Sequence, residues 1–166
     1  MVVQEINDIK CDSCVRKARV LVKDKNDKIL LITIEGSYCL PGGTVEEGED
    51  TKVTAMRELE EEVGLKLNDC DYLTTFTHYH ENFPHNKINK IGKRVNIIDY
   101  YYTDLDESCL HESHPTNYEL EHNMKILRVS PNEINDLFGA EPDSFKVFMD
   151  EELSTIITYA KVKGII

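Results

Sequence analysis

The stretch from Gly43 to Leu65 constrains this chain more than any other. Its acidic residues crowd together and repel one another: Glu58, Glu60, Glu61 and Glu62. At about 100° per residue in an α-helix, Glu58, Glu61 and Glu62 fall on one narrow face, and Leu59 and Val63 point the other way. The stretch therefore predicts a helix with an apolar packing face and a carboxylate face. Carboxylates in such a group can hold Mg²⁺ together with substrate phosphates, although a solvated acidic face is the usual meaning of a charge run.

The residues on either side of this helix favour its ends. A Pro41-Gly42-Gly43 turn precedes it, and the two glycines let the backbone approach a ligand closely. Asp50 and its neighbours supply capping chemistry at the helix start, and a glycine at position 64 suits a left-handed cap at its end.

These features together resemble the Nudix box, G-x5-E-x7-R-E-U-x-E-E-x-G-U, where U is a bulky aliphatic residue. Every fixed position is filled: Gly43, Glu49, Arg57, Glu58, Leu59, Glu61, Glu62, Gly64 and Leu65. The resemblance implies the Nudix fold, an α/β/α sandwich with a mixed β-sheet between helices. We expect residues 1–166 to form a single domain of this kind, since a chain of that length suits one core.

The resemblance also implies a hydrolase that cleaves a phosphoanhydride bond in a nucleoside diphosphate linked to another moiety. Mg²⁺ is the expected cofactor, with Mn²⁺ as a substitute. Its ligands would be the carboxylates of Glu58, Glu61 and Glu62 and the backbone carbonyl of Gly43.

Further catalytic candidates follow from the same resemblance. Arg57 is expected to orient Glu49 through a bidentate ion pair. In several members of the family a base or further ligand comes from a loop glutamate well after the box, and Glu119 and Glu121 are the candidates here. Which glutamate accepts the proton stays open.

The substrate is less constrained than the bond. A proline about fifteen residues after the box is associated with ADP-ribose, but His80 and Glu81 stand there, so a nucleoside triphosphate leads over ADP-ribose or another nucleotide sugar. A non-catalytic nucleotide-binding sensor is the alternative from another class. The candidate substrate contacts are Arg19, Tyr38, Lys87 and Arg94, with ordinary surface charge as the alternative for the basic residues.

Hydrophobic periodicity outlines the remaining elements. Alternation predicts a strand at residues 15–23, and β-branched and aromatic residues predict strands at 29–34, 72–80 and 95–105. A further short strand is predicted at 124–129. The segments 81–94, which is basic, and 106–122 are predicted as long loops. A capping-box pattern predicts a short helix at residues 130–138, and helical spacing predicts an amphipathic helix from Ser144.

Bulk properties limit the partners. The net charge of −12 argues against nucleic-acid binding. No apolar run is long enough to span a membrane and no signal peptide is visible, so we expect a cytoplasmic protein whose partner is a small nucleotide, with a homodimer as one assembly.

Five cysteines, an odd number, favour reduced thiols over a disulfide framework. Cys11 and Cys14 could be half of a zinc site that Cys109, His111 and His114 complete, but incidental thiols are the expected reading.

Overall fold

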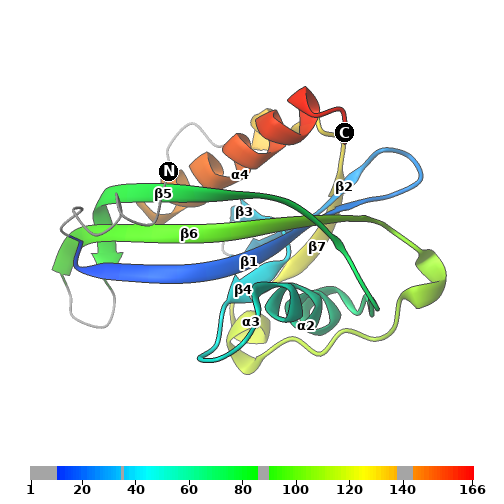
Figure 1. Cartoon of the computed structure of the whole chain (residues 1–166), viewed down its shortest axis with the longest axis horizontal. Coiled ribbons are helices and arrows are strands. Elements are labelled where there is room, and N and C mark those ends of the chain that lie inside the picture. The colour runs from blue at the N-terminus through cyan, green and yellow to red at the C-terminus, as the bar shows by residue number, and fades with distance from the viewer. Residues whose placement is uncertain (1–10, 35, 86–89, 138–143) are drawn as a thin grey trace.

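The computed structural model describes residues 11–34, 36–85, 90–137 and 144–166. Its strands are β1 (Ser13–Lys23), β2 (Ile29–Ile34), β3 (Ser37–Cys39), β4 (Gly42–Thr44), β5 (Asp71–His85), β6 (Lys90–Asp104) and β7 (Lys125–Val129). Its helices are α2 (Thr51–Val63), the 3₁₀ turn η1 (Glu107–Cys109), α3 (Asn117–Glu121), the 3₁₀ turn η2 (Ile134–Leu137) and α4 (Ser144–Val162) (Figure 1).

The seven strands form one mixed sheet. Its main path runs β3-β2-β1-β6-β5, with β4 paired to β1 and β7 paired to β2. The pairing of β1 with β6 is parallel over the whole length of β1, and the other pairs are antiparallel. The parallel pair brings together, in the middle of the sheet, two strands that lie far apart in the sequence.

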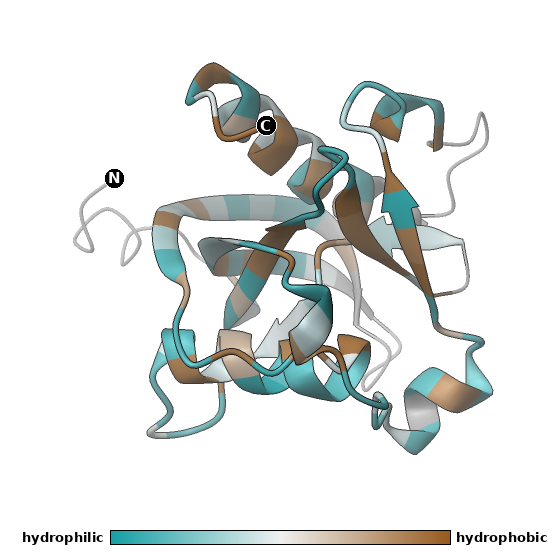
Figure 2. Cartoon of the chain, turned by 90° about the vertical axis from the view of Figure 1, so that its right-hand side faces the viewer, coloured by the Kyte–Doolittle hydropathy of each residue, from teal (hydrophilic) through white to brown (hydrophobic). Residues whose placement is uncertain are grey.

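Helices cover both faces of this sheet, with α2 on one side and α4 on the other (Figure 1). Alternation along β1 fills both cores: Ala18, Val20 and Val22 pack toward α2, and Leu21 packs toward α4. The hydrophobic segments gather on the strands between the two helices (Figure 2). The predicted α/β/α sandwich with a mixed sheet is confirmed.

The box helix α2 begins and ends where its sequence predicts. The carboxylate of Asp50, the N-cap residue, accepts a hydrogen bond from the backbone N–H of Lys52 at 2.8 Å. At the other end Gly64 adopts φ 75°, and its N–H donates to the carbonyl of Glu60 at 2.9 Å. Leu59, on the apolar face, is fully buried against the sheet.

The prediction of a loop over residues 81–94 is wrong. Strand β5 continues to His85 and β6 begins at Lys90, with a bulge between the His80–Arg94 and Phe83–Gly92 pairs. The bulge interrupts the alternation, which hid the strand from periodicity. Lys87 lies outside the described residues.

Two other local predictions need correction. Residues 106–122 contain η1 and α3 rather than a continuous loop, and the structure has only the 3₁₀ turn η2 within the described part of the helix predicted at residues 130–138. The closing helix predicted from Ser144 is confirmed as α4. Within the described residues, no helix is long and apolar enough to cross a membrane.

Candidate active site

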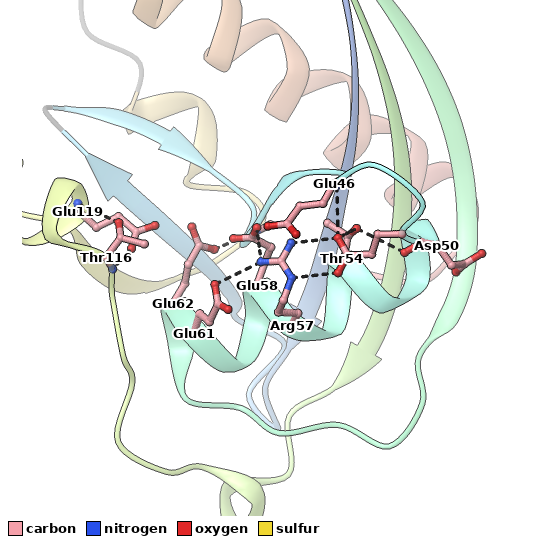
Figure 3. A network of polar contacts seen from close by, with 11 residues as sticks. Glu46, Asp50, Thr54, Arg57, Glu58, Glu61, Glu62, Thr116 and Glu119 are labelled. Atoms are coloured by element: carbon pink, nitrogen blue, oxygen red, sulfur yellow. Dashed lines mark hydrogen bonds and ion pairs between the residues drawn. The ribbon is translucent and has the colours of Figure 1, made fainter.

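The centre of the candidate site is an ion-pair network along α2 (Figure 3). Arg57 donates two hydrogen bonds to Glu49, from Nε to Oε1 at 3.0 Å and from Nη2 to Oε2 at 3.1 Å. The hydroxyl of Thr54 also donates to Glu49 Oε2, at 2.6 Å. The predicted bidentate contact is present, and it ties the loop before α2 to the second turn of the helix.

The same arginine contacts the carboxylate face of the helix. Its Nη1 donates to Glu58 Oε1 at 2.8 Å and to Glu61 Oε2 at 3.3 Å. Glu62 is bound differently, because its Oε2 accepts the backbone N–H of Gly42 at 2.8 Å. The box helix and the glycine turn are thereby joined on the side where the three carboxylates gather (Figure 3).

Gly43 lies directly against the Glu58 carboxyl group. A Cβ atom added to Gly43 would come within 2.8 Å of all three carboxyl atoms of Glu58. Only a glycine leaves room for this carboxylate beside the turn.

Burial and mutual repulsion set the protonation of these glutamates. Burial, together with the charges of Glu58 and Glu119, raises the pKa of Glu62 to about 8, against the opposing effects of the Gly42 N–H and Arg19. Burial likewise raises the pKa of Glu58, although Arg57 opposes this. The side-chain hydrogen bonds from Arg57 and Thr54 instead lower the pKa of Glu49 to about 2.

Comparison with known proteins agrees with this geometry. The family model for the NUDIX domain matches residues 15–150. The chain belongs to the Nudix family.

Nudix hydrolases act on pyrophosphate bonds, and solved Nudix structures share the fold of this chain. The NUDIX domain of Shewanella oneidensis NrtR, solved with ADP ribose, is 15% identical with a TM-score of 0.58, over 98% of this chain and 99% of that one. A C. elegans Ap4A hydrolase is 14% identical with a TM-score of 0.54, over 90% of this chain and 98% of that one.

A sequence relative matches a much shorter part. The methanol dehydrogenase activator of Bacillus methanolicus is 49% identical over 37 residues, which are 22% of this chain and 20% of that protein. The match therefore spans about a fifth of that relative's length.

Nudix proteins generally use divalent metal ions such as Mg²⁺, and the donor set here fits one. Within the described residues, no three acidic, histidine or cysteine side chains already converge as a metal cluster, and Glu58 and Glu61 share Arg57 Nη1 instead. However, the half-buried Glu58 and the buried Glu62 keep raised pKa values even with Arg57 and Arg19 nearby, so further positive charge would favour their ionised forms. A hard cation with oxygen ligands would supply it.

The two later glutamates that were candidates for the base lie in different settings. Glu119 is close enough to Glu58 and Glu62 for its charge to raise both pKa values. Its Oε2 accepts the backbone N–H of Thr116 at 2.6 Å, as in a capping box at the start of α3. Glu121 is exposed and lines a separate groove of about 440 Å³.

The predicted substrate contacts are not all accessible. Arg19 is only 6% exposed and donates from Nη1 to the carbonyl of Leu40, which goes against its prediction as a substrate contact. Tyr38 is half-buried and lines the same groove as Glu121. Arg94 is half-buried, with Cζ 4.2 Å from the ring centre of Phe83.

The zinc alternative is not supported. Cys14 pairs with Val95 at the start of β1, whereas the backbone of Cys109 and that of His111 bond to the segment after α2, at Lys66 and Gly64. All five cysteines are free thiols, and none belongs to a metal-binding group among the residues that the structure describes.

Sequence reasoning missed a second polar cluster, under α4. The Glu152 carboxylate is 3% exposed and its Oε1 accepts a hydrogen bond from Asn96 Nδ2 at 2.7 Å and lies 3.4 Å from His80 Nε2. Although burial opposes ionisation, the hydrogen bond with His80 and the charges of Lys17 and Arg19 lower the pKa of Glu152 to about 2. The available signal was that Glu152 lies within the apolar stripe of the closing helix, between Met149 and Ile156.

Proposed function

We propose that this Nudix protein is a Mg²⁺-dependent hydrolase that cleaves a phosphoanhydride bond in a nucleoside diphosphate linked to another moiety. A nucleoside triphosphate is the leading candidate substrate, and Mn²⁺ would replace Mg²⁺. The observation that carries the proposal is the carboxylate face of α2, which lies against the Pro-Gly-Gly turn and is braced by Arg57.

The residues that would hold the metal are Glu58, Glu61, Glu62 and the carbonyl of Gly43. When bound, the ion would neutralise phosphate oxygens and make an attacking water more acidic. Arg57 and Glu49 would act as positioning residues, since their bidentate pair fixes the guanidinium that contacts Glu58 and Glu61.

Glu119 is the better candidate of the two later glutamates for accepting a proton or adding a ligand. Its charge acts on Glu58 and Glu62, whereas Glu121 is exposed along the groove that also contains Tyr38. To reach the box, the Glu119 carboxylate would release the N–H of Thr116. The groove at Tyr38 and the half-buried Arg94 are the proposed contacts for the rest of the substrate.

ADP-ribose is the second candidate substrate. The observation in its favour is the structural similarity to the NrtR NUDIX domain that was solved with ADP ribose. Because the identity is 15%, this similarity supports the shared fold, and the choice of substrate needs an assay.

The test is hydrolysis of a panel of nucleoside triphosphates, ADP-ribose and dinucleoside polyphosphates with Mg²⁺, followed by chromatography of the nucleotide products, with phosphate or pyrophosphate release measured for the triphosphates. Replacing the proposed ligand Glu61 with Gln should reduce turnover by roughly 100-fold or more. Glu60→Gln is the matched control, since Glu60 pairs with Lys66 and lies off the carboxylate face. If no compound is hydrolysed, or if Glu61→Gln is as active as wild type, the proposal fails.

A further inference from the structure

Arg19 occupies an unusual place for an arginine. It lies on the central strand β1, is 6% exposed, and its side chain extends toward the α4 face of the sheet, where it lines a small cavity with Leu40, Tyr100 and Glu152. Its Nε has no hydrogen-bond partner among the described residues. A buried guanidinium is costly unless its contacts are specific, so the contact that it does make is informative.

That contact is with the turn that leads into the box. Arg19 Nη1 donates to the carbonyl of Leu40 at 2.5 Å. The backbone ladder of β1 and β4 pairs Arg19 with Gly42 and Ala18 with Gly43, and Val20 N–H donates to the Pro41 carbonyl at 2.9 Å. Leu40 lies just beyond this ladder. The hydrogen bond from the Arg19 side chain therefore holds the turn at the point where the backbone pairing ends.

The turn in its own right holds two of the box carboxylates. The N–H of Gly42 donates to Glu62 Oε2 at 2.8 Å, and Gly43 is in close contact with the Glu58 carboxyl group. A shift of the turn would therefore move both carboxylates together. Arg19 lies on the α4 face of the sheet and these carboxylates on the α2 face, and the turn connects them, while the charge of Arg19 also lowers the pKa of Glu62 directly.

The negative charge of Glu152 favours the charged form of Arg19 and opposes the effect of burial on its pKa. The ionised Glu152 carboxylate lines the same small cavity and is itself fixed by Asn96. The Glu152 charge offsets part of the cost of burying the Arg19 guanidinium. The Nη1 atom of Arg19 donates its hydrogen bond to the Leu40 carbonyl.

We propose that Arg19 is a positioning residue for the metal-binding carboxylates, acting through the turn at Leu40 to Gly43. The inference rests on the proposed function only in taking Glu58 and Glu62 as metal ligands. It replaces the expectation that Arg19 touches the substrate.

The test is Mn²⁺ binding to the substrate-free protein, measured by electron paramagnetic resonance or calorimetry, together with kcat and KM at saturating metal. Arg19→Met should weaken Mn²⁺ binding by about tenfold and lower kcat, with little change in the nucleotide KM. Arg19→Lys should recover part of the affinity, because an ammonium can still donate to the Leu40 carbonyl. Tyr100→Phe is the matched control, since Tyr100 lines the same cavity and its hydroxyl has no hydrogen-bond partner in the described part of the chain.

Unchanged Mn²⁺ affinity in a folded Arg19→Met variant would overturn the proposal. A rise in the nucleotide KM alone would also overturn it, and would restore Arg19 as a substrate contact. If Arg19→Met does not fold, Arg19→Lys is the test variant. Wild-type Mn²⁺ affinity of Arg19→Lys with an altered nucleotide KM would refute the proposal. A partial loss of Mn²⁺ affinity in Arg19→Lys, with Tyr100→Phe unaffected, would support it. Should wild type hydrolyse no nucleotide while Arg19→Met still loses Mn²⁺ affinity, the proposed function fails and this inference stands.

Discussion

Replacing Gly43 with alanine should damage activity far more than stability. The new Cβ would come within 2.8 Å of every carboxyl atom of Glu58, and ordinary contact begins near 3.4 Å. Even the farthest of these atoms must then retreat by about 0.6 Å, and the nearer two by more. Because the obstacle is the end of a flexible side chain, the fold can absorb the change. A misplacement approaching 1 Å in a catalytic group can cost about 100-fold in rate.

The comparison variant is Gly42→Ala. Its Cβ would meet the Ala18 carbonyl oxygen and lie 2.7 Å from Arg19 Cα, and Gly42 has φ 140°, which a residue with a side chain rarely adopts. Backbone cannot retreat as a side chain can, so this variant should lose stability as well as activity.

The assay pairs thermal unfolding with kcat on the best substrate from the panel. We expect Gly43→Ala to unfold within a few degrees of wild type and to lose about 100-fold in kcat, and Gly42→Ala to unfold at clearly lower temperature. If Gly43→Ala keeps wild-type kcat, then the position of the Glu58 carboxylate does not control turnover. If the two variants are equally destabilised, the distinction between side-chain and backbone obstruction is wrong.

Two further predictions concern stability. The pKa of Glu49 is about 2, below its ordinary 4.5, so its ionised form stabilises the fold above about pH 4.5 and this contribution is lost as pH falls toward 2. The difference in melting temperature between wild type and Glu49→Gln should therefore shrink over that range. A constant difference would contradict the ion-pair account. Leu59→Ala removes a fully buried side chain from the α2 core and should cost about 3 kcal/mol in urea unfolding, whereas a loss below about 1 kcal/mol would mean that the helix repacks.

The sequence alone determined the local geometry of the box. Spacing along one helix placed Glu58, Glu61 and Glu62 on one face because α-helical periodicity is fixed by the backbone. Asp50 and Gly64 bounded the helix through capping, which depends only on adjacent residues. The contact between Arg57 and Glu49 followed from the family pattern rather than from spacing.

Alternation and β-branched or aromatic content also predicted the strands, except at the end of β5, where the bulge between His80 and Phe83 interrupts the pattern and the segment was predicted as a loop.

Only the tertiary structure decided what surrounds the box. The parallel pairing of β1 with β6, the bond from Gly42 to Glu62, and the closeness of Glu119 to the box join segments far apart in the chain. The position of Arg19 changed most: the sequence made it a candidate substrate contact or an ordinary surface charge, and the structure buries it and bonds it to the Leu40 carbonyl. Periodicity assigns a residue to one face of a strand, but which segment covers that face depends on long-range packing, and no local pattern encodes it.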